Sequence, residues 1–305
     1  MWTVGDLNPR PPECKSLNGE LWQNYASWLF RTHSKAHAKE ILRCSKKYQV
    51  ILEKPNMASQ LLLLSKDMRR LAMSSLSNLS KYMGIYDVWK QTIRNYGLKW
   101  ENSSNLETFL SILNTNLDET ETWLKQVVKR LPKEYAVVLV FDALTGLRPN
   151  VAVASCKLIS DLSEKNELNA YLDRELMMLQ HFKFPELFLR KSKNAYISFV
   201  TSELLEMVIE TRPRIKYTAL DTKIGRLGCN TQTKQLRKIF ATRLRNSLPQ
   251  ELVDLLQGRI SQTVFMKFYY KPLLLDTQQK TIKALQSIPR RTPSFSSMKT
   301  LKALL

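Results

Sequence analysis

The segment Thr233–Pro272 reads TKQLRKIFATRLRNSLPQELVDLLQGRISQTVFMKFYYKP and sets cationic residues at regular intervals. Lys234 and Arg237 lie three residues apart, so on a helix they share one face. Arg259 follows a glycine at the expected end of a second short helix, and Tyr269 comes ten residues later. The pattern predicts two or three short basic helices that lead into a pair of tyrosines.

The overall charge points to a polyanionic partner. The chain of 305 residues carries 47 Lys and Arg against 27 Asp and Glu, a net charge of +20. Residues 31–99 alone hold fourteen Lys and Arg against four Asp and Glu, a net +10. Such an excess favours nucleic acid ahead of a membrane surface. The alternative is a basic surface that only keeps the protein in solution.

Several other classes of protein fit poorly. The longest apolar run, residues 136–141, is far shorter than the roughly 18 residues that span a bilayer. The N-terminus lacks the apolar core of a signal peptide, so we expect an intracellular, cytoplasmic protein. The four cysteines form no CxxC pair, and His33 and His37 lack further ligands. We expect no metal, no cofactor, no small-molecule substrate and no structural disulfide.

The sequence predicts a mainly α (α+β) chain with four segments. Residues 1–17 are rich in proline and are expected to form a flexible arm, and residues 18–100 follow a helical period throughout. A polar linker near 100–105 leads to a second, mostly helical domain over 105–275. A helix and a tail rich in Ser, Thr and Pro occupy 276–305.

The domain at 18–100 is expected to present a cationic surface to DNA phosphates, which adds affinity with little sequence information. The other interpretation is that these residues only form solvated helix faces. The candidate DNA-binding residues are Lys35, Lys39, Arg43, Lys46, Lys47, Arg69, Arg70, Lys90 and Arg94.

Within 105–275 we expect helices at about 117–131, 133–145, 150–163 and 168–182, and another from residue 202. Aromatic and β-branched residues favour a strand pair, 185–190 and 195–200, around a turn at 191–194. The basic segment 212–230 shows no periodicity and is expected to be irregular.

Six side chains together could cleave a DNA phosphodiester without a metal. Arginine makes bidentate contacts to phosphate and stays ionised, and each preorganised donor contributes about 3–4 kcal/mol to lowering such a barrier. A tyrosine that links covalently to the phosphate preserves the bond energy, and a lysine can protonate the departing oxygen. The candidate catalytic residues are Arg148, Lys193, Lys234, Arg237, Arg259 and Tyr269.

At these residues the chain resembles the tyrosine recombinase (phage integrase) family. Thr145–Arg148 (TGLR) matches the arginine turn that begins the family pattern, and Lys193 matches a lysine in a β-hairpin. Lys234–Arg237 (KQLR) matches the His/Lys-x-x-Arg helix start. Gly258–Arg259 and then Tyr269 complete the pattern in order and spacing. Each motif alone is weak, but as a set they are specific.

The resemblance implies a DNA clamp over 18–100, a catalytic domain over 105–275 and double-stranded DNA attachment sites as the partner. It also implies a dimer to tetramer on DNA. Lysine at 234 and arginine at 259, where histidine is commoner, are similar to the archaeal fusellovirus-type integrases. Those enzymes insert into tRNA genes, and Asp6–Pro9 back-translates to codons compatible with a tRNA T-arm.

Some assignments stay open. Tyr269 leads Tyr270 as the nucleophile, and Lys193 leads Lys191 as the hairpin lysine. Family members often have a carboxylate three residues after the first arginine, where this chain has Val151. Taken alone, Arg148 could be a helix cap, Arg237 part of a structural ion pair and Arg259 a surface cation. Tyr269 by itself could be a core aromatic residue.

The function that this resemblance implies is site-specific DNA recombination through a 3′-phosphotyrosine intermediate. Such an enzyme integrates or excises a mobile element or viral genome. The alternatives are a catalytically inactive DNA-binding regulator with the same fold and a type IB topoisomerase-like enzyme that nicks and closes DNA as a monomer.

Overall fold

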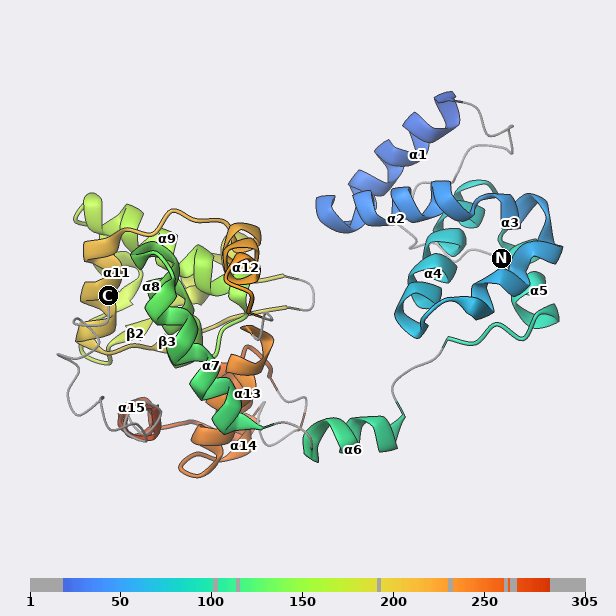
Figure 1. Ribbon diagram of the computed structural model, residues 1–305. Coiled ribbons are helices and arrows are strands. Elements are labelled where there is room, and N and C mark those ends of the chain that lie inside the picture. Colours follow the sequence, from blue (N-terminus) through green and yellow to red (C-terminus); the bar gives the residue numbers. More distant parts are fainter. Residues whose placement is uncertain are drawn as a thin grey trace. The chain divides into compact units, whose positions relative to one another are not determined.

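The structure is a computed structural model that describes residues 19–100, 104–113, 116–190, 193–229, 233–260, 263 and 268–285 (Figure 1). The chain divides into two compact units, residues 1–112 and residues 113–305, and each is described by itself. The described residues are mainly helical with one small antiparallel sheet, which confirms the expected mainly α class. The expected arm at 1–17 and the end of the tail lie outside the described residues.

The N-terminal unit is helical throughout its described part, as its apolar period predicts. Pro55 stands at the first position of a 3₁₀ helix, where its missing N–H is not needed. The elements are α1 (Gly19–Thr32), α2 (Lys35–Tyr48), α3 (Val50–Glu53), η1 (Pro55–Leu63), α4 (Lys66–Tyr82), α5 (Tyr86–Asn95) and α6 (Asn105–Leu113), the last of which crosses the division between the units.

Buried hydroxyl groups join the helices of this unit. The Tyr25 hydroxyl on α1 lies 3.2 Å from Ser45 Oγ on α2, and Ser45 Oγ donates to the Ser75 carbonyl on α4 at 3.1 Å. The indole of Trp89 on α5 donates to Ser77 Oγ on α4 at 2.9 Å. All five side chains are buried, and the bonds join α4 directly to α2 and α5, and α2 in turn to α1.

The C-terminal unit is built around α8 (Lys133–Thr145), which is buried on nearly all sides. Four further helices pack against it: α7 (Leu117–Arg130), α9 (Pro149–Glu164), α11 (Ser202–Thr211) and α13 (Thr233–Arg245). The remaining helices of this unit are α12 (Tyr217–Arg226), α14 (Gln250–Leu256) and α15 (Leu274–Leu285). Three short helical turns complete it: η2 (Leu168–Ala170), η3 (His181–Lys183) and α10 (Pro185–Phe188).

The helices at 117–131, 133–145 and 150–163 and the helix from residue 202 match their expected bounds closely. Asn116 caps α7 by accepting from the backbone N–H groups of Asp118 and Glu119. Thr201 caps α11 in the same way, by accepting from the N–H of Leu204. A polar cap beside a clear apolar period therefore made α7 and α11 predictable.

The expected helix at 168–182 is wrong. Strands β1 (Leu172–Asp173) and β2 (Met178–Leu179) form an antiparallel pair there, with Leu172 opposite Leu179. The Asp173 carboxylate accepts from the N–H of Leu176 at 3.1 Å, and Met177 takes a positive φ of 45°. An aspartate that binds the backbone ahead of it favours a turn over a helix, which explains the error.

The expected strand pair is also wrong in its first arm. Residues 185–188 form the single helical turn α10, because proline is favoured at the first helical position and Phe188 points into the core. The second arm contributes β3 (Ser198–Phe199), which pairs antiparallel with β2 rather than with 185–190. The sheet order is β1-β2-β3.

The segment 212–230 was expected to be irregular, but α12 forms within it at Tyr217–Arg226. Leu220 and Ile224 lie four residues apart and both are buried. Contact of these two residues with the core is thus enough to order a helix. The basic residues around them hid the helical period in the sequence.

Candidate functional site

Three arginines from three separate elements gather in the C-terminal unit. Arg148 precedes α9, Arg237 lies on α13, and Arg259 follows α14. Burial lowers the pKa of Arg237 to about 10, and the charges of Arg148 and Arg259 act in the same direction. Burial also lowers the pKa of Arg148, with Arg259 and Arg190 adding to the effect. We call Arg148, Arg237 and Arg259 the arginine cluster.

Backbone carbonyls hold the two inner arginines. Arg148 Nη1 donates to the carbonyl of Asn194 at 3.0 Å, and Arg237 Nη2 donates to the carbonyl of Gln257 at 3.1 Å. A carbonyl orients a guanidinium without cancelling its charge, so both side chains keep N–H groups and positive charge for another acceptor. Arg259 differs, because its Nη1 lies 3.3 Å from the carboxylate of Asp254 in an ion pair that is mostly exposed.

Gly258 brings Arg259 against the turn that carries Asn194. Gly258 has a φ of +74°, and a Cβ atom there would lie 1.7 Å from the Asn194 carbonyl oxygen. The same carbonyl accepts from Arg148. A residue other than glycine cannot fit without moving the turn, so this contact joins the Arg259 loop, the Asn194 turn and Arg148.

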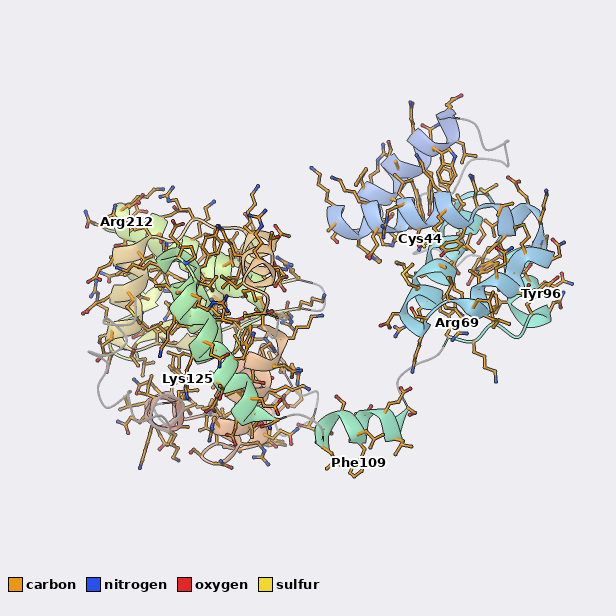
Figure 2. All side chains as sticks on the ribbon, in the orientation of Figure 1. Cys44, Arg69, Tyr96, Phe109, Lys125 and Arg212 are labelled. Carbon is orange, nitrogen blue, oxygen red and sulfur yellow. The ribbon has the colours of Figure 1, made fainter. Side chains whose placement is uncertain are left out.

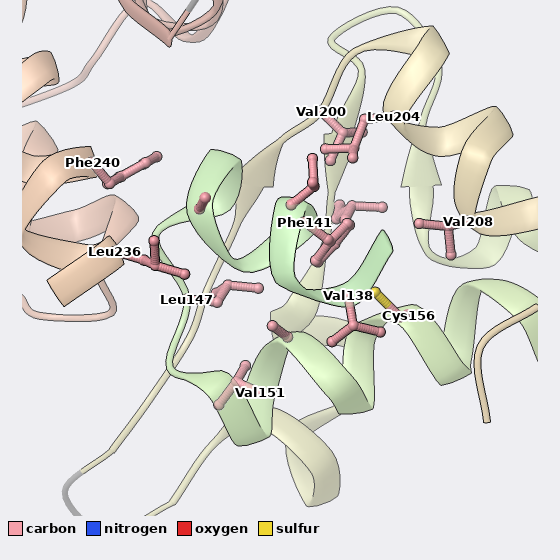
Figure 3. Packing of buried hydrophobic residues seen from close by; sticks show 14 of the residues in the cluster. Val138, Phe141, Leu147, Val151, Cys156, Val200, Leu204, Val208, Leu236 and Phe240 are labelled. Carbon is pink, nitrogen blue, oxygen red and sulfur yellow. The ribbon is translucent and has the colours of Figure 1, made fainter. Parts of the chain in front are cut away.

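A second close approach joins α8 to α13. Gly146 ends α8 with a φ of +61°, and a Cβ atom there would lie 2.2 Å from the ring of Phe240 on α13. Figure 3 shows Leu236 and Phe240 on α13 beside the turn that carries Leu147. The turn that positions Arg148 and the helix that positions Arg237 are therefore in direct contact.

A buried ion pair fixes α13 from its other end. Arg243 donates from Nε and Nη2 to the same carboxylate oxygen of Glu121 on α7, with 3.1 Å for the Nε bond. The side chain of Glu121 is 4% exposed and that of Arg243 is 13% exposed. A pair at this depth is costly to break from one side, so α13 is held firmly to α7.

The predicted lysines lie on the surface beside the cluster. Lys193 is exposed and directly precedes Asn194, whose carbonyl holds Arg148. Lys234 is exposed in the first turn of α13, three residues before Arg237. Lys191, the other candidate for the hairpin lysine, lies outside the described residues.

The two candidate tyrosines differ in their exposure to solvent. Tyr269 is 75% exposed, and within the described part of the chain no hydrogen bond joins it to the cluster. Tyr270 is half-buried and packs against the core of the unit. Burial raises the pKa of Tyr270, Glu251 raises it further, and Lys280 opposes them.

Sequence reasoning missed four residues of this site. Asn194 and Gln257 supply the carbonyls, and Arg190 lies close enough to Arg148 to lower its pKa. Asp142 is 1% exposed on α8 and is the acidic residue that faces Arg237. A lone aspartate inside the apolar run VVLVFDALTG was the signal that could have revealed Asp142.

The N-terminal unit presents a basic helix face. Lys35, Lys39, Arg43 and Lys46 recur every three or four residues along α2, so they follow one stripe, and all four are exposed. Figure 2 shows nitrogen-tipped side chains extending from this helix. Of the other candidates, Lys47, Arg70, Lys90 and Arg94 are exposed and Arg69 is half-buried.

Some of these cations already have partners. Lys46 Nζ lies 5.4 Å from the ring centre of Trp22, and Lys47 Nζ lies 5.2 Å from that of Tyr48. Lys90 pairs with the Asp87 carboxylate at 2.5 Å. Contacts of this kind at an exposed surface are worth about 1 kcal/mol or less, so they do not prevent a lysine from reaching a phosphate.

Three general features of the described chain bear on its class. The described residues contain no group of three or more His, Cys, Asp or Glu side chains that could hold a metal. Cys44, Cys156 and Cys229 are free thiols. No single described helix is long and apolar enough to cross a membrane, although α8 and α9 pass that test together with a bend of 113° between them.

No protein-family model matches this chain, and no curated protein matches it.

Proposed function

We propose that this chain is a site-specific DNA recombinase of the tyrosine type. The observation that carries the proposal is the convergence of Arg148, Arg237 and Arg259 on one site, with two of them held only through backbone carbonyls. Guanidinium groups match the non-bridging oxygens of a phosphodiester, which carry the negative charge of its transition state, and Arg148 and Arg237 keep N–H groups for them.

In the proposed reaction the Tyr269 oxygen attacks a DNA phosphorus atom. The bond from phosphorus to the 5′ oxygen breaks, and the DNA 3′ end remains attached to the tyrosine. Lys193 donates a proton to the departing 5′ oxygen, and the phenol proton of Tyr269 leaves to solvent, with Lys234 beside the same phosphate. The phosphate carries one negative charge before and after the transfer, and the arginine cluster stabilises the additional charge that develops between them. Reversal with another 5′ end rejoins the strands.

The exposed position of Tyr269 adds one requirement. Its side chain is open to solvent, so a phosphate can reach it, but the cluster must come to the same phosphate. Catalysis therefore requires Tyr269 and the arginines to contact one phosphate when DNA is bound. Catalytic contacts that form only in the substrate complex are common in enzymes.

The basic stripe of α2 supports the same proposal from the other unit. Exposed cations at helical spacing fit the phosphate backbone and would supply affinity without reading the sequence. We propose double-stranded DNA attachment sites as the partner, with two to four copies of the chain assembled on them. Integration or excision of a viral genome or mobile element at a tRNA gene is the expected biological outcome, in a host cytoplasm.

The test is a covalent adduct on nicked suicide DNA. Nicked duplexes tiled across the chain's own coding sequence are incubated with the full protein in EDTA, and adducts are resolved on denaturing gels. The wild type should form an adduct that Tyr269→Phe abolishes and Tyr270→Phe retains. Loss in Tyr270→Phe alone would reassign the nucleophile, and adducts on every duplex with relaxation of supercoiled plasmid would indicate the topoisomerase-like reaction.

A second candidate is a DNA-binding regulator that keeps the fold without the chemistry. The exposed side chain of Tyr269, which has no hydrogen bond to the cluster among the described residues, favours it. It predicts DNA binding with no adduct from the wild type on any duplex. Binding without an adduct would therefore replace the recombinase proposal with this one.

A further inference from the structure

Asp142 is a buried acid whose role the proposed reaction does not use. It lies in the last part of α8, one turn before Gly146, and is 1% exposed. Neither of its carboxylate oxygens has a hydrogen-bond partner. A buried carboxylate without partners is costly, so a folded protein seldom keeps one unless it serves a purpose.

Within the described residues, Arg237 is the charged group that faces Asp142. The titratable groups that face its carboxyl in the described chain are Arg237 on α13, Cys156 on α9 and Tyr217 on α12. Burial raises the pKa values of both Cys156 and Tyr217 above their usual ranges, so both are neutral at ordinary pH. Arg237 is thus the single cation among them.

Asp142 is more deeply buried than Arg237. α8 and α13 are in contact, and the Gly146–Phe240 approach holds them closely together just beyond Asp142. Arg237 itself is half-buried and reaches the carbonyl of Gln257. An anion from solvent can reach the partly exposed Arg237, whereas the buried Asp142 is closed to solvent.

We propose that Asp142 is an internal counter-ion that competes with a bound phosphate for Arg237, so that anion binding at the arginine cluster is coupled to proton uptake by the Asp142 carboxyl. This inference rests on the proposed function only in taking the cluster as a phosphate site. When Asp142 is ionised, it offsets one charge of the cluster. When an anion binds, Asp142 loses part of its attraction to Arg237 and takes a proton from solvent.

The direction of the effect follows from linkage. Burial raises the pKa of Asp142 well above its usual range, and Arg237 opposes that rise. Below this pKa the acid is neutral, the cluster has its full charge, and anion affinity is independent of Asp142. Above it, affinity falls with pH, and the slope of log Kd against pH approaches one. Coupling energies of this kind usually correspond to about a 5- to 150-fold change in affinity.

The test measures sulfate binding to the full chain between pH 5 and pH 9.5. Sulfate keeps the same charge over that range, so any pH dependence belongs to the protein. Affinity is taken from the thermal shift with sulfate at constant ionic strength, and Arg237→Gln supplies the background from other basic sites. The wild type should lose affinity above the Asp142 pKa, and Asp142→Asn should bind with a pH-independent Kd close to the wild-type value at low pH.

Asp221→Asn is the matched control. Asp221 lies on α12 against Tyr217, has an unpartnered oxygen, and does not face Arg237. That variant should keep the wild-type pH dependence. The inference is overturned if Asp142→Asn retains the pH dependence, or if the wild type shows none.

The two proposals fail separately. Sulfate binding with the expected pH dependence but no DNA adduct would remove the recombinase chemistry and leave the inference intact. A DNA adduct together with pH-dependent sulfate binding in Asp142→Asn would remove the inference and leave the recombinase. Sulfate shifts in the wild type that equal those of Arg237→Gln would show that the cluster binds no sulfate and would overturn the inference.

Discussion

Arg237 and Gln257 bind each other in both directions. Arg237 Nη2 donates to the Gln257 carbonyl at 3.1 Å, and Gln257 Nε2 donates to the Arg237 carbonyl at 2.9 Å. Each residue therefore fixes the backbone or side chain of the other across the contact between α13 and the end of α14. This pair orients the guanidinium group of Arg237.

Gln257→Ala should loosen that pair and lower stability by about 1–2 kcal/mol, since a buried side chain and one of its two hydrogen bonds are removed. Urea unfolding followed by circular dichroism measures the change. Gln250→Ala, at an exposed position on α14, should change stability by less than about 0.5 kcal/mol. Equal losses in the two variants would contradict the structural role given to Gln257.

Gly258→Ala should be more harmful than an ordinary substitution at a left-handed glycine. The φ of +74° costs a side chain about 1 kcal/mol, and the collision with Asn194 adds to it, for a total of about 2–4 kcal/mol. The same substitution at Gly228 is the control, because its φ is +70° and nothing lies within 4 Å of the added carbon.

The two glycine variants separate backbone strain from contact. Both are measured by urea unfolding, and Gly258→Ala should also weaken sulfate binding because it displaces the Asn194 carbonyl that orients Arg148. If both variants lose the same free energy of unfolding, the close contact between Gly258 and the Asn194 turn adds nothing to the cost of the substitution.

The sequence predicted most of the helices and named the three arginines that the structure brings together, but it could not predict how their side chains are oriented. Helices such as α7 and α11 were predictable because a polar cap and an apolar period coincide. The short strands were not, because two-residue strands have no period to detect and a local bond at Asp173 decides the turn. The carbonyl of Asn194 acts through the backbone, so its side-chain identity gives no signal.

His181 should make stability fall in acid. It is fully buried, and its ring lies 2.6 Å from the Tyr171 hydroxyl and 2.9 Å from Ser198 Oγ. Burial lowers its pKa from 6.5 to about 3. Between these values the unfolded chain binds a proton that the folded chain refuses, so stability is fully present above about pH 6.5 and is lost as pH falls toward 3.

The contribution of His181 should reach about 1.4 kcal/mol for each pH unit in that window. Urea unfolding from pH 7 to pH 4 measures it as the difference in slope between the wild type and His181→Gln, because carboxylates titrate equally in both. His37→Gln, at an exposed histidine on α2, should keep the wild-type slope. An unchanged slope in His181→Gln would mean that the buried ring is protonated in the folded protein.

The α2 stripe should govern how DNA affinity responds to salt. The double variant Lys39→Gln with Arg43→Gln removes two neighbouring cations from one helix face, and neither lies in the arginine cluster. If both contact phosphates, the slope of log K against log salt should become shallower by about 1.8, because each contact releases roughly 0.9 of a counterion.

Fluorescence anisotropy with a duplex of fixed sequence, titrated from 50 to 300 mM NaCl, measures that slope. The control is Lys165→Gln with Lys183→Gln, which removes the same charge from the C-terminal unit at positions outside the cluster. The control should lower affinity less and leave the slope closer to that of the wild type. Equal slopes in the two double variants would mean that DNA is attracted by the net charge of the protein rather than by the α2 stripe. The slope depends on the number of ordered phosphate contacts, so loss of such contacts should change it more in the α2 variant than in the control.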